Sequence, residues 1–395
     1  MTPGSGAPRR AEWALLLGNF ATGCGVMVVP GAMNDIVRSL QVSVAAGGQL
    51  VTVAAATMAL GAPLLAFAVG VRDRRAVLTL ALVWYALGHA LSALMPNYAL
   101  LTPVRAACML GAALFTPQAA AAIGWLAPPE QRGRAITFVF LGWSVASVIG
   151  MPIASFVGDA FGWRVAFALV AVLSLAGAAA VWATVPAGVK PSVAGLAAWQ
   201  QVFAQPVLLA VVLVTALSAS GQFSIFSYMA PIFRGELGAG ANAITALFFW
   251  FGVFGLAGNV LVSRSIDRLG AAPLVAGLLA LMLVSFALWP MAQSVVVMGL
   301  VLVPWALACF ASNSAQQARL GAAAPTLAPV LMALNTSAIY GGQALGAAGG
   351  GAVIAANEAA ARAPFGGLAL LAAAWMAAAL ALSLWAARRM RSATA

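Results

Sequence analysis

Residues 258–270 read Gly258-Asn-Val-Leu-Val-Ser-Arg264-Ser-Ile-Asp267-Arg268-Leu-Gly270 and stand between two long apolar runs. Earlier in the chain, residues 66–75 read Ala66-Phe-Ala-Val-Gly70-Val-Arg72-Asp73-Arg74-Arg75 and also follow an apolar run. Each stretch lies at the same place in its own half of the chain. Such a weak internal repeat around charged loops predicts a membrane protein built from two related halves.

The composition supports a chain that lies mostly in lipid. Of its 395 residues 64% are apolar and only 7% are charged, and the mean hydropathy is +1.02. A soluble domain is about half apolar and carries about a quarter charged residues, so a soluble fold is excluded. Because a membrane-spanning helix needs about 20 apolar residues, the chain has room for about a dozen.

Apolar runs bounded by charges, prolines and short polar clusters predict an all-α membrane protein with twelve transmembrane helices. The predicted helices cover 13–33, 48–69, 76–95, 99–123, 135–158, 163–185, 207–230, 241–262, 273–291, 294–317, 327–355 and 364–387. The longest connection, 186–206, divides them six and six. This predicts an N-terminal half at 1–185, a linker, and a C-terminal half at 207–395.

The linker carries a short amphipathic pattern. Its residues Leu196, Trp199, Val202 and Phe203 fall at helical spacing. A short helix in the membrane interface and a solvated connector explain this pattern equally well.

The basic residues predict the orientation of the chain. With the N-terminus inside, 14 of the 19 lysines and arginines fall on one face and four on the other, and Arg105 lies within a helix. Cytoplasmic loops collect these residues, so we expect both termini and the linker in the cytoplasm. The net charge of +11 is therefore a topology signal, and we expect no nucleic-acid partner.

Two further expectations concern location and cofactors. The bias toward alanine, glycine and arginine, with Lys190 as the single lysine, suggests a GC-rich bacterial genome and hence an inner membrane. Cys24, Cys108 and Cys309 lie in apolar stretches without metal-ligand spacing, so we expect no metal, disulfide or cofactor.

Three more motifs accompany the two loops: Leu101-Thr-Pro-Val-Arg105 in the fourth predicted helix, Gly150-Met-Pro152 in the fifth with Gly162-Trp163-Arg164 after it, and Asn335-Thr-Ser-Ala-Ile-Tyr340-Gly341-Gly342 in the eleventh. Together with Asp267-Arg268-x-Gly270 they resemble the major facilitator superfamily, and within it the sugar-efflux and drug:proton antiporter branch of the arabinose efflux permease type. The first loop is degenerate, because only its basic end matches. The resemblance implies two pseudo-symmetric six-helix halves that move a small solute by alternating access.

Arg105 is the strongest single candidate for function, because a charge inside a membrane helix costs several kcal/mol on insertion scales. The resemblance implies a proton-coupling pair between Arg105 and a carboxylate near the end of the first helix, where Asp35 matches. The alternatives are a structural ion pair for Arg105 and, for Asp35, a loop carboxylate balanced by Arg38. His89, the only histidine, is a conceivable proton relay. The resemblance implies that the third helix is peripheral, which favours a structural histidine that is hydrogen-bonded to a neighbouring helix.

Side chains at helical spacing mark candidate faces of a substrate cavity. They lie on the fourth predicted helix, beside Arg105, and on the seventh, tenth and eleventh. The resemblance implies that the seventh and tenth helices line the cavity. The candidates are Met109, Thr116, Thr215, Ser218, Gln222, Phe226, Asn313, Gln317 and Asn335. Hydrogen bonding between helices without any ligand explains the same residues almost as well.

Conformational gating is expected at the loops and in the fifth helix. The loop candidates are Arg74, Arg75, Asp267 and Arg268. In the fifth helix, Gly150 would let the two halves approach and Pro152 would kink the chain. Ordinary small-residue packing is the alternative.

The leading functional hypothesis is a monomeric secondary transporter that exports a small organic solute in exchange for protons. A proton-independent importer or facilitator is the alternative. A membrane-embedded enzyme has the least support, because the eight acidic residues fall at helix ends or in loops on both faces rather than in one cluster.

Overall fold

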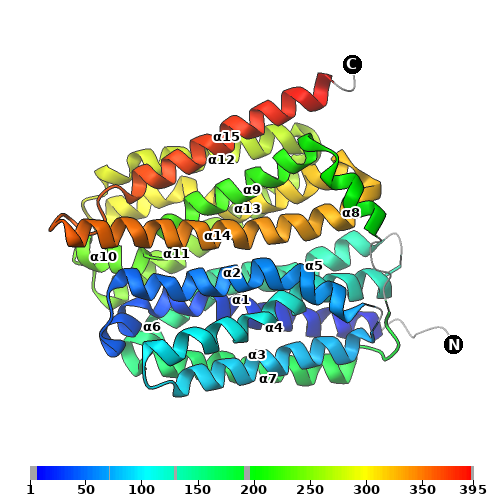
Figure 1. Cartoon of the computed structure of the whole chain (residues 1–395), viewed down its shortest axis with the longest axis horizontal. Helices are drawn as coiled ribbons and strands as arrows, with labels where there is room; N and C mark the ends of the chain where they lie inside the picture. Colours follow the sequence, from blue (N-terminus) through cyan, green and yellow to red (C-terminus); the bar gives the residue numbers. More distant parts are fainter. Residues whose placement is uncertain (1–6, 71, 129–130, 191–195, 393–395) are drawn as a thin grey trace. The chain divides into compact units, whose positions relative to one another are not determined.

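The computed structural model describes residues 7–70, 72–128, 131–190 and 196–392, and within these ranges the regular structure is helical (Figure 1). The helices are α1 (Ala7–Leu40), α2 (Val44–Val69), α3 (Arg74–Leu94), α4 (Tyr98–Leu126), α5 (Arg132–Val145), η2 (Ala146–Gly150), α6 (Met151–Phe161), α7 (Trp163–Thr184), α8 (Leu196–Phe203), α9 (Pro206–Phe226), α10 (Met229–Leu237), α11 (Ala241–Leu269), α12 (Ala271–Leu288), η3 (Trp289–Met291), α13 (Val295–Ala323), η4 (Pro325–Leu327), α14 (Ala328–Ala359) and α15 (Leu368–Ser392).

Eleven helices within the described residues are long and apolar enough to cross a membrane. The predicted span at 327–355 corresponds to α14, which is long enough but rich in glycine and in polar residues such as Asn335 and Gln343. A helix that packs mainly against protein does not need an apolar surface all round. The prediction of an all-α membrane protein is confirmed.

The chain forms two compact units. Unit 1 comprises Met1–Gln41 and Thr57–Val193, and unit 2 comprises Val42–Ala56 and Ala194–Ala395. The first part of α2 thus groups with unit 2, which no sequence pattern indicated. Part of the predicted linker, 191–195, lies outside the described residues. The division into halves at 186–206 stays a prediction.

Both units use the same packing scheme. In unit 1, α1 packs against α5, α6 and α7, and α3 packs against α4 and α7. In unit 2, α9 packs against α14 and α15, and α12 packs against α13 and α15. Helices at corresponding places in the chain therefore make corresponding contacts, as an internal repeat requires.

Glycine makes the closest of these contacts possible. In unit 1, three glycines lie so close to α1 that an added Cβ would crowd its atoms: Gly142, Gly150 and Gly158. In unit 2, three glycines of α14 approach α9 in the same way: Gly342, Gly346 and Gly350. Small residues let two helix backbones come together. The neighbour of Gly150 is Cys24 of its own unit, so its contacts are the small-residue packing that we weighed as the alternative to gating.

A turn of π-helix interrupts the fifth predicted span. This turn, η2, directly precedes α6, of which Pro152 is the second residue. Proline has no N–H to bond the carbonyl of the preceding turn, and a wider turn accommodates this loss. The sequence predicted a kink at Pro152, and the structure places a wider helical turn next to this residue. Its role in gating stays a prediction.

Two predicted helix ends differ from those in the structure. Helix α1 continues to Leu40, so Asp35 lies within the helix and not at its end. The seventh span ends at Phe226, and α10 follows after a short break. Pro231 in the first turn of α10 explains the break, because its ring removes a hydrogen bond to the preceding turn. In the linker, residues Leu196–Phe203 form the short helix α8, which favours the helical interpretation of their spacing over a solvated connector. Its location at the membrane interface stays a prediction.

Candidate functional site

Arg105 lies inside unit 1, two turns into α4. That helix begins where the Asn97 side chain accepts a hydrogen bond from the backbone N–H of Leu100. Arg105 is only 1% exposed. Its Nη2 donates to the carbonyl of Gly25 on α1 at 2.6 Å, and its Nη1 lies 3.0 Å from Nε2 of His89 on α3. Its guanidinium carbon lies 5.5 Å from the ring centre of Phe167 on α7. One side chain therefore contacts three other helices of the same unit, and these partners are uncharged groups.

The His89 ring has its two nitrogens in different roles. Nδ1 lies 2.9 Å from the carbonyl of Tyr85, which accepts hydrogen bonds only. Arginine donates hydrogen bonds only, so Nε2 must be the acceptor in the contact with Arg105. The geometry thus fixes the neutral tautomer that carries its proton on Nδ1. Cys108 lies beside the same ring, with its sulfur 3.1 Å from Nδ1.

Arg105, His89 and Tyr85 can pack against α1 because α1 has a glycine, Gly25, at the point of contact. A Cβ at Gly25 would overlap the Tyr85 hydroxyl and the His89 ring. Tyr85 adds a second link to α1 by donating to the carbonyl of Thr22 at 3.0 Å. Sequence reasoning missed Gly25, Tyr85 and Phe167. The one available signal was a glycine inside a helix, which costs about 1 kcal/mol relative to alanine and therefore implies close packing.

The predicted contact of His89 with a neighbouring helix is confirmed, and its partner is Arg105 itself. The predicted pairing of Arg105 with Asp35, in contrast, is absent, because the two residues have separate partners. Arg105 meets α1 at Gly25, and Asp35 follows ten residues later, which is about 15 Å along the helix axis at 1.5 Å per residue. The two groups therefore lie at different depths along α1, which does not allow the direct pairing that the resemblance implies.

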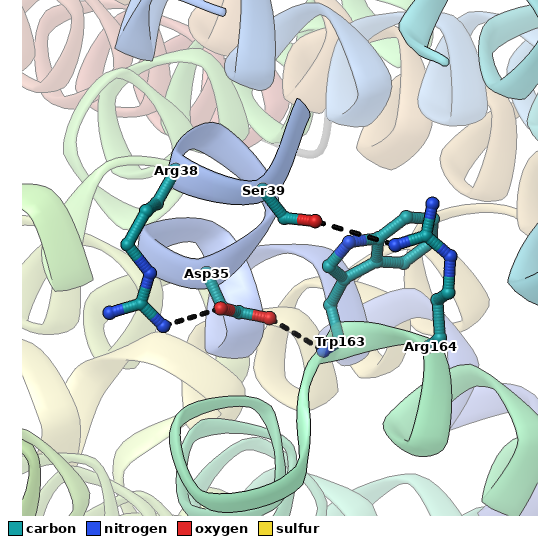
Figure 2. A network of polar contacts seen from close by, with 5 residues as sticks. All are labelled: Asp35, Arg38, Ser39, Trp163 and Arg164. Carbon is teal, nitrogen blue, oxygen red and sulfur yellow. Dashed lines mark hydrogen bonds and ion pairs between the residues drawn. The ribbon is translucent and has the colours of Figure 1, made fainter. Parts of the chain in front are cut away.

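Asp35 instead joins α1 to the beginning of α7 (Figure 2). One carboxylate oxygen, Oδ2, accepts a hydrogen bond from the backbone N–H of Trp163 at 2.7 Å. The other, Oδ1, lies 2.5 Å from Nη2 of Arg38. Gly162, with φ of 92°, makes the turn that presents the Trp163 N–H. A carboxylate at the N-terminus of a helix satisfies a free N–H group and interacts favourably with the helix dipole.

Arg164 completes this junction. Its guanidinium donates to the hydroxyl of Ser39 at 3.3 Å (Figure 2) and to the carbonyl of Met95 at 3.0 Å. It also lies over the ring of Trp163. The Gly162-Trp163-Arg164 motif therefore connects the end of α1, the end of α3 and the start of α7.

We expect Asp35→Ala to lower the unfolding free energy by about 1–2 kcal/mol, because it removes the side-chain cap of α7. The ion pair adds little, because Arg38 is 61% exposed and exposed pairs contribute about 0–1 kcal/mol. Asp35→Asn keeps an oxygen that accepts from the Trp163 N–H, so it should melt close to wild type. Thermal unfolding of the purified variants checks this order. Equal melting of Asp35→Ala and wild type would contradict it.

Two of the four loop candidates, Arg74 and Arg75, make local contacts in unit 1, and the gating role of all four stays a prediction. Arg74 is buried, and its guanidinium donates to the carbonyls of Gly70 and Arg72 where α2 ends. Arg75 lies over the Trp182 ring of α7 at 4.2 Å. In unit 2, Asp267 and Arg268 are exposed in the last turn of α11. Arg74 therefore satisfies the free carbonyls at a helix end, as basic groups often do.

The candidate cavity residues of unit 2 form hydrogen bonds with one another and with the core. The Thr215 hydroxyl on α9 donates to Asn335 Oδ1 on α14 at 2.6 Å. The Gln222 side chain bonds Ser218 and accepts from the indole of Trp305 on α13. Gln317 lies 3.5 Å from Asn313, and Phe226 packs near the Trp305 ring. The Thr215–Asn335 and Gln222–Trp305 bonds are the interhelical bonding proposed as the alternative to a substrate cavity, whereas the Gln222–Ser218 and Gln317–Asn313 bonds lie within single helices. The role of these residues as substrate contacts stays a prediction.

The two candidates of unit 1 are also packed. Met109 is fully buried, and Thr116 accepts a hydrogen bond from the Trp143 indole at 3.3 Å. Their role as substrate contacts stays a prediction.

A chain of long apolar helices in two units, with a buried arginine inside one of them, is the architecture of a multi-pass membrane protein. The family model of the Major Facilitator Superfamily matches residues 15–347, so the chain belongs to that superfamily and is a transporter rather than an enzyme.

Individual relatives agree with this assignment. The chain is 30% identical over 347 residues to the inner membrane transport protein YdhP of Escherichia coli K12, a match that covers 87% of this chain and 88% of that protein. Among solved structures, a bacterial homolog of the human lysosomal transporter Spinster, in an inward-facing and occupied conformation, aligns with a TM-score of 0.75 at 18% identity over 98% of both chains. A D-xylose-proton symporter aligns with a TM-score of 0.74 at 17% identity, over 95% of this chain and 97% of its own. These structures support the fold.

Proposed function

We propose that the protein exports a small organic solute from the bacterial cytoplasm in exchange for protons, by alternating access in the inner membrane. The observation that carries the proposal is Arg105. A guanidinium that is 1% exposed within a membrane-spanning helix and held by uncharged partners is costly, and such charges serve function by default. The name of the Escherichia coli relative supports the membrane assignment.

Asp35 enters the proposal as the second coupling residue. Its carboxylate ties α1 to the first backbone N–H of α7 and to Arg38. A proton on the carboxylate removes its charge and weakens both contacts. The protonation state of Asp35 would thus alter how two helices of unit 1 are held together, and proton coupling needs such a group.

A screen in cells tests export. Intracellular accumulation of sugars, amino acids, nucleosides and cationic drugs is compared in cells that express wild type, the Arg105→Ala variant or no protein. We expect at least one class to accumulate less with wild type, and the difference to vanish with Arg105→Ala. Higher accumulation with wild type would contradict export. A difference that persists after the proton gradient is dissipated would favour the facilitator alternative.

A further inference from the structure

The first residues of the predicted linker turn back onto unit 1. Pro186, Ala187 and Gly188 are exposed, and Gly188 has a φ of 82°, which glycine adopts without strain. The next residue, Val189, is fully buried, and Lys190 is exposed again. One valine of the predicted linker is therefore packed inside unit 1.

The side chain of Val189 belongs to the hydrophobic core of this unit. The same core cluster contains Leu78 of α3, Ala127 at the end of α4 and Ala135 of α5. Withdrawal of the valine from this cluster would return its side chain to water, which is unfavourable for an apolar group. The valine thus anchors the linker to the helix bundle.

The backbone of Val189 makes a second contact, at the start of α3. Its carbonyl accepts a hydrogen bond from the backbone N–H of Arg74 at 2.9 Å. The first N–H groups of a helix have no partner within the helix. The Asp73 side chain accepts from the N–H of Arg75, and the linker supplies the acceptor for the N–H of Arg74.

This contact lies beside the arginines that are predicted to take part in gating. The Arg74 guanidinium donates to the carbonyls of Gly70 and Arg72, and the Arg75 guanidinium lies over the Trp182 ring in the last turn of α7. The chain that leaves α7 therefore supports the point at which this loop enters α3.

We infer that residues 186–190 form a latch that holds the start of α3, with Arg74 and Arg75, in its present position. If Val189 leaves the core, its carbonyl moves with it, and the Arg74 N–H loses its acceptor. Displacement of the linker is thereby transmitted to the predicted gating arginines of unit 1. The role of these arginines in transport rests on the proposed function, but the docking of Val189 does not.

Hydrogen exchange of the full chain in detergent tests the latch, with fragmentation that resolves the Arg74 amide. This amide is informative because its acceptor is a backbone carbonyl, which no side-chain substitution removes. In Val189→Asp an unpaired charge cannot stay among apolar side chains, so the latch should open. We expect the Arg74 amide to exchange roughly tenfold faster than in wild type, or more, because the open latch exposes it to water.

Two variants serve as controls. Ala187→Asp adds the same charge to an exposed residue of the same turn, and Val189→Ile keeps a branched apolar side chain. In both, the Arg74 amide should exchange at close to the wild-type rate. The amide of Leu274, which bonds the Gly270 carbonyl at the start of α12, reports on unit 2 and should be unchanged in every variant.

If Val189→Asp does not yield monodisperse protein, Val189→Ala takes its place, and a smaller increase is expected because alanine fills the core less well. An unchanged Arg74 amide in the variant that folds would overturn the inference, and so would equal acceleration by Ala187→Asp or Val189→Ile. None of these readouts involves transport. Solute export that ignores the proton gradient would therefore count against the proposed function and leave the latch intact.

Discussion

Arg105→Ala is expected to lower solute transport by roughly 100-fold or more while the protein still inserts and folds. The alanine removes both hydrogen bonds and the charge in one step, and it leaves the Gly25 carbonyl and His89 Nε2 without a donor. The measurement is the initial rate of solute efflux from proteoliposomes, normalised to the amount of monodisperse protein.

Arg105→Lys is the matched variant for charge. It keeps a cation but lacks the planar fork that reaches Gly25 and His89 at once, so it should recover little activity. Near-normal transport by Arg105→Ala would show that the arginine only fills space. Full recovery by lysine would show that charge alone matters and that the geometry of the cluster does not.

The second large effect concerns stability and compares two adjacent glycines of α14. A Cβ at Gly342 would overlap the backbone carbonyl of Ala216 on α9, so Gly342→Ala must push two helices apart. Overpacking of this kind costs about 1–3 kcal/mol. A Cβ at Gly341 meets no atom of the described residues within 4 Å, so Gly341→Ala should gain up to about 1 kcal/mol from higher helix propensity.

Thermal unfolding in one detergent compares the two variants with wild type. We expect melting temperatures that move in opposite directions, lower for Gly342→Ala and unchanged or higher for Gly341→Ala. If both variants melt alike, α14 and α9 do not depend on the close approach that the structure shows.

Most of the fold could be predicted from the sequence because lipid imposes a simple rule. Long apolar runs must be helices, and the corresponding positions of the loops at 66–75 and 258–270 predicted two related halves. The rule does not locate helix ends, where local chemistry decides. Pro231 ends α9 early, and α1 continues past Asp35 because its polar residues find partners on α7.

The candidate site was predictable only in part. Arg105 stands out because a charge in an apolar run is rare, but its partners are a backbone carbonyl and a histidine on another helix, which no spacing in the chain connects. Asp35 was matched to Arg105 by family resemblance. In the structure Asp35 lies too far along α1 to reach Arg105, and its carboxylate accepts a hydrogen bond from the Trp163 N–H instead. Polar faces on α9 and α13 predicted hydrogen-bonding side chains, although polarity alone did not distinguish a cavity from a packed interface.

The central claim is that solute leaves in exchange for protons and that Asp35 is needed for the coupling. The most direct test is solute efflux from proteoliposomes under an imposed pH gradient, using a solute identified by the accumulation screen. We predict that acid outside accelerates efflux by wild type, and that Asp35→Asn, which keeps the cap of α7, loses this response. Wild-type efflux that ignores the gradient, or an Asp35→Asn variant that responds as wild type does, would contradict the claim.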